Sequence, residues 1–293
     1  MTASSAADEM ALRRTPGRRL VSRRLAIRAL LGALAVLGAW SFVLAQATGP
    51  LPTVESVIGR SRGFAADLLG ASTDAAPAFA TVAGWQWVGG LVVDTLVMSV
   101  LAMGLAGAGT LVSLAPASRR MMVGETGTRR RLFGRVALVA ARGTHAVLRG
   151  VPEFIWALLI VFVMRPGILA GTIALALHEA GVLGRLGSDV VDDLESHSLQ
   201  SLRSAGANSP QLLAYGALPQ VLPQLVTFLL YRWEVVIRAT VIVGFITGAG
   251  LGHALRLALS FRRWTEVALV LLAYVMLVWV VEVAATLLRR LAR

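Results

Sequence analysis

The sequence has no lysine and no cysteine, and only four histidines occur among its 293 residues. Without cysteine the chain has neither disulfides nor thiolate metal sites, and the scattered histidines lack the spacing of metal ligands. A Walker A loop needs its lysine on the nucleotide phosphates, and no apolar run carries the paired side chains that an intramembrane enzyme uses. We therefore predict no catalytic residue, no metal and no cofactor in this chain.

Apolar residues are abundant instead. They make up 56% of the chain, and the mean hydropathy is +0.72. Several runs exceed the roughly 18 residues that indicate a membrane helix. We predict an all-α integral membrane protein with about six transmembrane helices. The expected spans are Leu25–Ala47, Val88–Leu114, Val136–Met164, Ile168–Leu183, Val221–Gly248 and Val267–Leu288.

The third of these spans is the least regular. Its fully apolar part, Phe154–Met164, is too short to cross a bilayer alone at about 1.5 Å per residue. We expect its helix to begin near Gly143 and to continue through the apolar part. It then includes Arg149 and Glu153, whose spacing of four residues allows an ion pair. Pro152 between them suits either a first helical turn or a kink.

The arginines predict the topology. Segments expected to face the cell interior hold 18 arginines, whereas segments expected outside hold 6, which follows the positive-inside rule. We attribute the net charge of +12 to this topology rather than to nucleic-acid binding. The prediction is a multi-pass protein of the cytoplasmic membrane with both termini cytoplasmic. Its divisions are a basic tail (1–28), a first membrane helix with an extracytoplasmic segment (29–87), and a core (88–293) containing a cytoplasmic segment (185–219).

Two N-terminal features leave alternatives open. The sequence Ser22–Leu25 resembles a twin-arginine export signal, with Ala45–Ala47 as its cleavage site; the alternative is an uncleaved anchor, which the long apolar run favours. Residues Thr53–Leu69 place apolar side chains at helical spacing. They form either an amphipathic helix on the outer membrane surface or a simple connector.

Polar residues of the fifth span recur at helical spacing. They are Gln220, Gln224, Thr227, Tyr231, Glu234 and Arg238. At 100° per residue they fall within one sector roughly 80° wide, so one face of the helix is polar. We call this face the polar stripe. Arg232 lies outside it and needs a separate partner.

The span carries three charges, Arg232, Glu234 and Arg238. They cost about 7–11 kcal/mol while the apolar residues of the span return only about 5–9 kcal/mol, so the polar stripe cannot face lipid. One interpretation is a solute path in which Arg232 or Arg238 attracts an anion. The alternative is a Glu234–Arg238 pair that only locks the helices together. On the first interpretation the substrate pathway contains Arg149, Glu153, Thr227, Tyr231, Arg232, Glu234 and Arg238.

The cytoplasmic segment contains a candidate docking helix, Gln200–Pro219. It has a short apolar face, Gly206 allows close approach to the backbone, and Pro219 is expected to end the segment before the membrane. The residues of the apolar face are Leu202, Ala205, Leu212 and Leu213. Spacing alone is equally consistent with a solvated loop.

This segment resembles the EAA loop of ABC-importer permeases, which reads Glu-Ala-Ala, three residues, Gly, nine residues and Ile-x-Leu-Pro. Gly206 and Leu218-Pro219 match at that spacing, whereas Gln200 replaces Glu, Ser201-Leu202 replaces Ala-Ala, and Gly216 replaces Ile. Further stretches, at 149–159, 175–186, 205–224 and 231–252, resemble phosphonate-type permeases. The resemblance covers about residues 130–290.

The resemblance implies the type I ABC-importer permease fold and transport of phosphonate, phosphite or a related oxyanion. It also implies cytoplasmic ABC ATPase subunits that use ATP and Mg, a second permease copy in a homodimer or paired dimer, and an extracytoplasmic substrate-binding protein, all at a lipid membrane. The ATPase-coupling residues would be Gln200, Leu202, Arg203, Ala205, Gly206, Ala207, Asn208, Tyr215, Leu218 and Pro219. The glycines at 244, 248, 250 and 252 suit a bend or close packing at an outer gate.

Two alternative functions remain at this point. One is an ABC permease for a different small anionic or amino-acid-like solute. The other is a secondary transporter that works without an ATPase, although the sequence shows no internal inverted repeat of the kind many such transporters have.

Overall fold

The computed structural model describes residues 23–46, 53–71, 75–122, 128–194 and 196–291, and these residues form helices and no strand. The all-α prediction is confirmed. The chain divides into two compact units, Met1–Ser61 and Arg62–Arg293. Residues 1–22, which contain most of the expected basic tail and the start of the export motif, lie outside the described residues, so both remain predictions.

The first unit contains α2 (Arg23–Ala45), which closely matches the first expected span. Its side chains are exposed along the helix, including Leu34, Trp40 and Phe42. At about 1.5 Å per residue its 23 residues extend about 34 Å, enough to cross the hydrocarbon core. An apolar helix of this kind needs lipid or protein around it.

Helix α3 (Val54–Leu68) confirms the helix expected within Thr53–Leu69. In the second unit the ring of Phe64 meets the ring of Trp264 edge-on, with centroids 5.3 Å apart. Whether α3 lies on a membrane surface remains a prediction.

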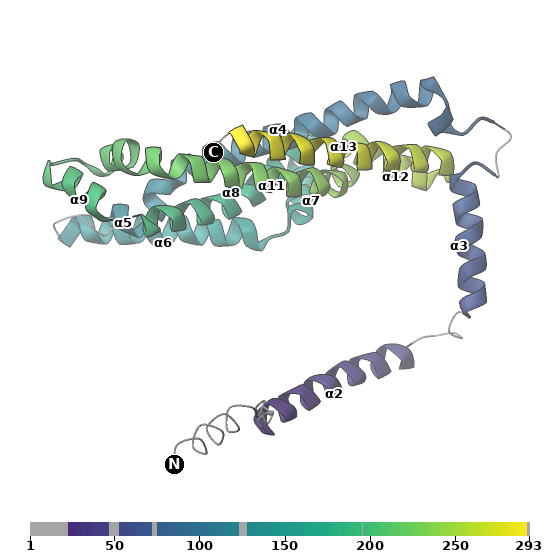
Figure 1. The fold of residues 1–293 in the computed structure, drawn as a ribbon, viewed down its shortest axis with the longest axis horizontal. Coiled ribbons are helices and arrows are strands. Elements are labelled where there is room, and N and C mark those ends of the chain that lie inside the picture. Colours follow the sequence, from purple (N-terminus) through teal and green to yellow (C-terminus); the bar gives the residue numbers. More distant parts are fainter. Residues whose placement is uncertain (1–22, 47–52, 72–74, 123–127, 195, 292–293) are drawn as a thin grey trace, which may run out of the picture. The chain divides into compact units, whose positions relative to one another are not determined.

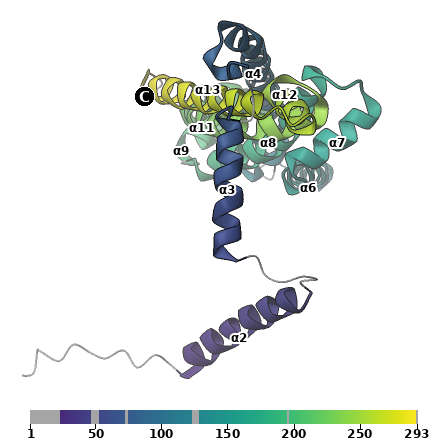
Figure 2. The same ribbon diagram turned by 90° about the vertical axis from the view of Figure 1, so that its right-hand side faces the viewer.

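Four long helices form the body of the second unit: α4 (Val82–Ala117), α8 (Ile168–Asp193), α11 (Leu218–Thr247) and α13 (Trp264–Leu291). They run alongside one another in Figure 1 and gather into a bundle in Figure 2, with the most extensive contact between α4 and α8. The 36 residues of α4 extend about 54 Å, so this helix must protrude from a hydrocarbon core of about 30 Å.

Glycines on α8 allow its neighbours to approach closely. A Cβ atom at Gly181 would lie 2.7 Å from the Cβ of Leu148 on α6 (Thr128–Gly150), and one at Gly187 would lie 2.8 Å from Leu114 on α4. Small residues therefore hold the bundle together, as they do in other membrane helices. The helix continues to Asp193, ten residues beyond the expected end of the fourth span.

The third span differs from the prediction. Instead of one helix reaching Met164, α6 and α7 (Glu153–Val163) meet at a bend of 95°. Pro152 lies at this break, because its ring disfavours helical backbone in the preceding residue and it has no N–H to donate. The single-helix prediction is wrong.

The fifth span also continues beyond its expected end. Helix α11 is followed, across a 55° bend, by α12 (Gly250–Ser260), which occupies residues expected to lie outside the membrane bundle. Gly248 and Gly250 have left-handed φ angles of 73° and 55° at this bend. The backbone N–H of Leu251 donates to Thr95 Oγ1 at 2.9 Å, which joins α12 to α4. The expected glycine bend and close packing are confirmed.

The number of candidate spans agrees with the prediction. Among the described residues, four helices are long and apolar enough to cross a membrane, namely Leu25–Ala45 of α2 and the whole of α4, α8 and α13. The two bent pairs bring the number up to six if each pair is one span.

Candidate functional site

The coupling segment, which we define as residues 196–217, begins with α9 (Ser196–Ser204) and a glycine turn. Gly206 has a φ angle of 86°, its N–H donates to the carbonyl of Arg203 at 2.9 Å, and the N–H of Ala207 donates to that of Leu202 at 3.1 Å. This pair of bonds is the Schellman helix ending, for which glycine is the preferred residue. The expected docking helix is thus two helical pieces joined by a turn.

The second piece begins with a reciprocal cap. The side-chain oxygen of Asn208 accepts from the N–H of Gln211, and the side-chain oxygen of Gln211 accepts from the N–H of Asn208, both at 3.0 Å. After α10 (Ser209–Gln211), the π-helical turn η2 (Leu212–Ala217) runs without a break into α11. Pro219 lies in the first turn of α11, where proline is well tolerated. The expectation that Pro219 ends the segment is wrong.

One face of the coupling segment packs against the bundle. Leu199 and Leu212 are buried in a cluster with Leu114 of α4 and Val191 of α8. A Cβ atom at Gly216 would lie 2.8 Å from Leu199 and 2.9 Å from Leu202. The glycine at this position, where the EAA pattern has isoleucine, therefore lets α9 pack against η2.

The other face of the segment is open. Six of the ten predicted coupling residues are exposed: Gln200, Ala205, Gly206, Asn208, Tyr215 and Pro219. The remaining four, Leu202, Arg203, Ala207 and Leu218, are half-buried. Tyr215 is the most prominent, with 76% of its surface exposed. The segment thus has an inner face that fixes its position and an outer face available to a partner; contact with an ATPase remains a prediction.

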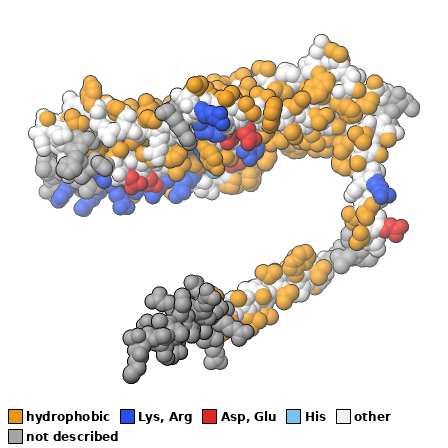
Figure 3. All heavy atoms as spheres, viewed as in Figure 1, with side chains coloured by type: hydrophobic (Ala, Val, Ile, Leu, Met, Phe, Trp, Pro, Cys, Tyr) orange, Lys and Arg blue, Asp and Glu red, His pale blue; other side chains and the backbone are white. Residues whose placement is uncertain are grey.

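The polar stripe follows one side of α11. Its members Gln220, Gln224, Tyr231 and Arg238 are exposed, whereas Thr227 and Glu234 are half-buried. Figure 3 shows one group of charged side chains over α11 beside α13, surrounded by largely apolar surface, and a second charged row along the lower left edge of the bundle. The structure therefore places the stripe on an open side of this single chain.

Arg232 points away from the stripe and forms an ion pair with Glu179 of α8. Its Nε and Nη2 atoms donate to the two carboxylate oxygens at 2.8 and 2.5 Å. The Glu179 side chain is only 4% exposed. The partner that Arg232 was expected to need is therefore an acid on a neighbouring span.

Glu234, another charge of the predicted pathway, also has its partner on a different helix, whereas Arg238 does not. Arg289 of α13 approaches Glu234 to 2.5 Å and donates to Thr286 Oγ1 at 2.9 Å. Arg238 donates from Nε to the backbone carbonyl of Glu234 at 2.9 Å rather than to its carboxylate. The alternative Glu234–Arg238 ion pair is therefore wrong.

The prediction of an ion pair between Arg149 and Glu153 is also wrong. The bend at Pro152 separates the two residues onto α6 and α7, and Glu153 Oε2 lies 3.8 Å from Nε2 of His178 on α8. The Nδ1 atom of His178 lies 3.0 Å from the carbonyl of Val151. This contact ties α8 to the break between α6 and α7.

These contacts distinguish the two arginines proposed to attract an anion. Arg232 is neutralised by a buried carboxylate, and neutral pairs of this kind exert little field on a passing anion. Arg238 is exposed and has no carboxylate within ion-pair distance among the residues that the structure describes. Arg238 is therefore the uncompensated positive charge of the stripe.

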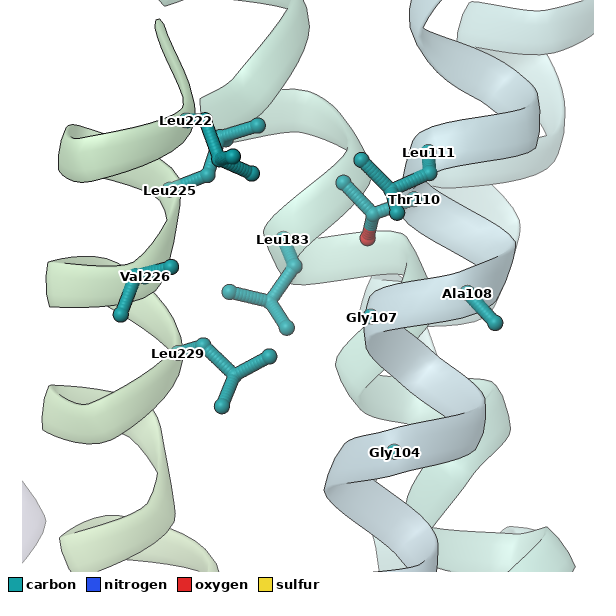
Figure 4. A pocket seen from close by; sticks show the side chains of 10 residues that line it. All are labelled: Gly104, Gly107, Ala108, Thr110, Leu111, Leu183, Leu222, Leu225, Val226 and Leu229. Atoms are coloured by element: carbon teal, nitrogen blue, oxygen red, sulfur yellow. The ribbon is translucent and has the colours of Figure 1, made fainter. Parts of the chain in front are cut away.

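A cavity of ≈ 370 Å³ between α4, α8 and α11 is unsuited to a polar solute. Figure 4 shows leucine and valine side chains from α11 and α8 facing the glycines of α4 across it. Its one hydroxyl, that of Thr110, donates to the carbonyl of Ala106 at 2.8 Å. At 100° per residue its α11 residues lie on the side of the helix opposite the polar stripe. The cavity offers an anion no charge and no free side-chain donor.

Sequence reasoning missed Glu179, His178 and Arg289. A signal for Glu179 existed, because a lone acid in the fourth span and a lone base outside the stripe each required a partner within the membrane. The Asn208–Gln211 cap was also readable, since it has the spacing of a capping box. The Arg289–Glu234 contact had no comparable signal, because no pattern in the sequence places the end of α13 beside the middle of α11.

A family model and several curated proteins are similar in sequence to this chain. A family model described as the binding-protein-dependent transport system inner membrane component matches residues 126–292. The phosphite transport system permease protein PtxC of Stutzerimonas stutzeri is 32% identical over 224 residues, which are 73% of this chain and 78% of PtxC. The phosphate-import permease protein PhnE of Mycolicibacterium smegmatis is 30% identical over 172 residues, which are 59% of this chain and 30% of PhnE.

A further curated relative and a solved structure are also similar to parts of this chain. The cryptic phosphonate transport system permease protein PhnE2 of Escherichia coli is 39% identical over 83 residues, 28% of this chain and 68% of PhnE2. An inward-facing structure of the MetNI methionine ABC transporter matches with a TM-score of 0.58 at 18% identity, covering 73% of this chain and 99% of that chain. The structural match confirms the expected ABC-importer permease fold. The chain therefore belongs to the family of inner-membrane components of binding-protein-dependent transport systems and is a transport subunit.

Proposed function

We propose that this chain is the permease subunit of an ATP-driven importer that carries a phosphorus oxyanion across the cytoplasmic membrane. The observation that carries the proposal is the continuity between an exposed coupling segment and the helix that bears the polar stripe. The names of the relatives supply the substrate class, since they specify phosphite, phosphate and phosphonate. All three are tetrahedral phosphorus oxyanions.

The proposal includes partners on both sides of the membrane. A pair of ABC ATPase subunits in the cytoplasm binds the exposed face of the coupling segment and hydrolyses ATP with Mg. An extracytoplasmic binding protein delivers the anion, and both chain termini lie in the cytoplasm. A second permease copy covers the polar stripe, because Arg238 and the exposed glutamines would be costly in lipid. The solute path then runs between two copies.

Movement passes from the coupling segment to the path through one helix. The backbone is helical from Leu212 to Thr247, so a displacement of η2 by the closing ATPases tilts α11. The bend at Gly248 lets α12 stay against Thr95 of α4 while α11 moves. Alternating exposure of the polar stripe to the two sides follows from this tilt.

Within the path, Arg238 attracts the anion by its charge, and neutral side chains then provide hydrogen bonds toward the inner end. These are Tyr231, Thr227, Gln224 and Gln220. A single uncompensated arginine suits transport, because a site with several charges would hold the anion too tightly to release it.

Reconstitution tests this function. The chain is co-expressed with the ATPase and binding protein of the same transport system, and ATP-dependent uptake into proteoliposomes is measured for phosphite, methylphosphonate, phosphate and methionine. We expect uptake of at least one phosphorus oxyanion that requires ATP and the binding protein. Uptake of methionine alone would indicate an amino-acid importer. Uptake that proceeds without the ATPase would indicate a secondary transporter.

A further inference from the structure

The carboxylate of Asp192, in the last turn of α8, accepts hydrogen bonds from three other segments. Its Oδ1 atom accepts from the hydroxyl of Ser118 at 2.7 Å and from the backbone N–H of Arg120 at 3.2 Å. Its Oδ2 atom accepts from Arg142 Nη2 of α6 at 2.6 Å. The side chains of Asp192 and Arg142 are 18% and 17% exposed. One acid therefore joins α8, α6, the C-cap of α4 and the short helix α5 (Arg119–Met122).

A second layer of bonds extends this cluster to the coupling segment. Arg120 donates from Nε to the backbone carbonyl of Asp192 at 2.6 Å, and the carbonyl of Arg120 accepts a hydrogen bond from Arg203 of α9. Arg142 also donates from Nε to the carbonyl of Ala117 at 2.9 Å. An unbroken chain of hydrogen bonds thus runs from α9 through α5 to α8, α4 and α6.

The negative charge of Asp192 strengthens this network, because its carboxylate is partly buried among charged donors. Bonds between an ionised acceptor and a charged donor are about twice as strong as neutral ones, and removing one partner of a buried pair leaves the other charge uncompensated. The neighbouring Asp193 is exposed. Arg185 and Asp189 form an ion pair in which the two side chains are 38% and 43% exposed. Of these three aspartates, Asp192 alone combines partial burial with hydrogen bonds to several helices in the described part of the chain.

The apolar cluster beneath the coupling segment cannot perform the same task. Contacts of Leu199 and Leu212 with the bundle hold α9 and η2 down, but hydrophobic contact is non-directional and permits sliding. Hydrogen bonds have defined directions, so the bond from Arg203 to the carbonyl of Arg120, together with the bonds from Arg120 to Asp192, sets the register between α9 and the bundle through α5. The apolar contacts therefore hold the coupling segment against the bundle, whereas the hydrogen bonds define its position along the bundle.

We propose that Asp192 is the positioning residue that transmits displacement of the coupling segment to α6 and α8. The inference rests on the proposed function, because it assigns a task within the coupling of ATP hydrolysis to transport. Two routes then leave the segment: η2 moves α11 through the backbone, and Arg203 moves α5, α6 and α8 through the Asp192 network. Without the Asp192 carboxylate the first route remains, whereas the second loses its charged bond to Arg142, so α11 tilts while α6 does not follow.

The functional test compares Asp192→Asn with Asp193→Asn in the complete reconstituted transporter. Asparagine preserves the size of the side chain but presents no charge to Arg142. We expect Asp192→Asn to lower anion uptake per ATP hydrolysed by about tenfold while the ATPase remains bound and basal hydrolysis continues. Asp193→Asn should match the unmodified protein. Arg142→Gln should reproduce the defect, and the double variant should be no worse than either single one.

A structural test needs only the permease. Because the chain has no cysteine, Ala140→Cys on α6 and Ser204→Cys on α9 provide two exposed sites for spin labels. The distribution of distances between the labels should broaden or shift in the Asp192→Asn background and remain unchanged in the Asp193→Asn background.

Three results would overturn the proposal. These are uptake per ATP equal to that of Asp193→Asn, an unchanged distance distribution, and failure of the Asp192→Asn complex to assemble, which would assign Asp192 a role in folding alone. The two tests also separate this proposal from the proposed function. If the unmodified transporter carries no phosphorus oxyanion, the substrate assignment fails, whereas the label distances still decide whether Asp192 links α9 to α6.

Discussion

Arg232 on α11 and Glu179 on α8 form a two-point ion pair, with Nε–Oε2 at 2.8 Å and Nη2–Oε1 at 2.5 Å. The pair lies on the side of α11 away from the polar stripe, so it joins α11 to α8 without involving the stripe. A charge within a membrane helix is expensive unless it is paired or solvated. The same reasoning singles out Arg238, which has no such partner among the described residues.

Glu179→Gln should destabilise the permease by about 3–5 kcal/mol, because Arg232 would remain charged and buried without its partner. Thermal unfolding in detergent measures this loss as a fall in the midpoint temperature. The double variant Glu179→Gln/Arg232→Gln should recover much of the loss, since no isolated charge remains.

Glu282→Gln provides the matched control, because Glu282 is an exposed acid on α13 without an ion pair in the described structure. Its midpoint temperature should not fall. If Glu179→Gln unfolds at the same temperature as this control, the pair does not stabilise the bundle.

Arg238→Gln should lower anion uptake by about tenfold or more while leaving assembly with the ATPase intact, because it removes the uncompensated charge and keeps a polar side chain of similar length. Uptake and co-purification are measured on the same preparation. Arg290→Gln, an exposed arginine in the last turn of α13, should transport normally. Unchanged uptake in Arg238→Gln would remove Arg238 from the mechanism.

Substitutions of Gly206 should separate backbone strain from contact with the ATPase. Alanine and tryptophan both pay a cost of about 1 kcal/mol for the left-handed backbone, but only tryptophan adds bulk, and no atom of this chain lies within 4 Å of a Cβ atom there. We expect Gly206→Trp to reduce binding-protein-stimulated ATP hydrolysis far more than Gly206→Ala, with the ATPase still bound. Equal activity in the two variants would exclude Gly206 from the docking surface.

Gly216→Ile installs the residue of the EAA pattern and should nevertheless be harmful here. Its side chain would press on Leu199 and Leu202, whose atoms lie 2.8 and 2.9 Å from the Cβ position. Overpacking of this kind costs about 1–3 kcal/mol and should displace α9, which limited proteolysis of the coupling segment would detect. Leu202→Ala in the same chain should relieve the crowding. Normal resistance to protease in the single variant would contradict the packing described for Gly216.

The sequence predicted helix faces better than helix ends. The polar stripe follows from the spacing of its residues, and the structure places it along one side of α11, because the 3.6-residue repeat is a local property. Pro152 and Gly248 marked possible breaks in the sequence, but the size of the bend at each was decided by the packing. A proline can begin a helix or interrupt one, and a glycine can pack or bend, and the choice depends on what lies against it.

For the coupling segment, too, the sequence located the element, but packing decided which of its side chains are buried. Gly206 and Leu218-Pro219 identified it through their resemblance to the EAA loop, but the direction in which its leucines point depends on the helices beneath. Leu202 and Leu212 were expected on the apolar face of the segment, and this face packs toward the bundle. Its exposed face instead carries Gln200, Asn208 and Tyr215.

By itself, the sequence determined that this protein is a helical membrane protein with a polar stripe on one helix. Hydropathy, the distribution of arginines and helical periodicity are read along the chain, so they do not depend on how the helices pack. Only the tertiary structure decided that Arg232 pairs with Glu179, that Glu234 pairs with Arg289, and that Asp192 gathers its neighbours. Such contacts join residues far apart in sequence, 53 positions in the case of Arg232 and Glu179, and the helices must be packed before a charge can select its partner.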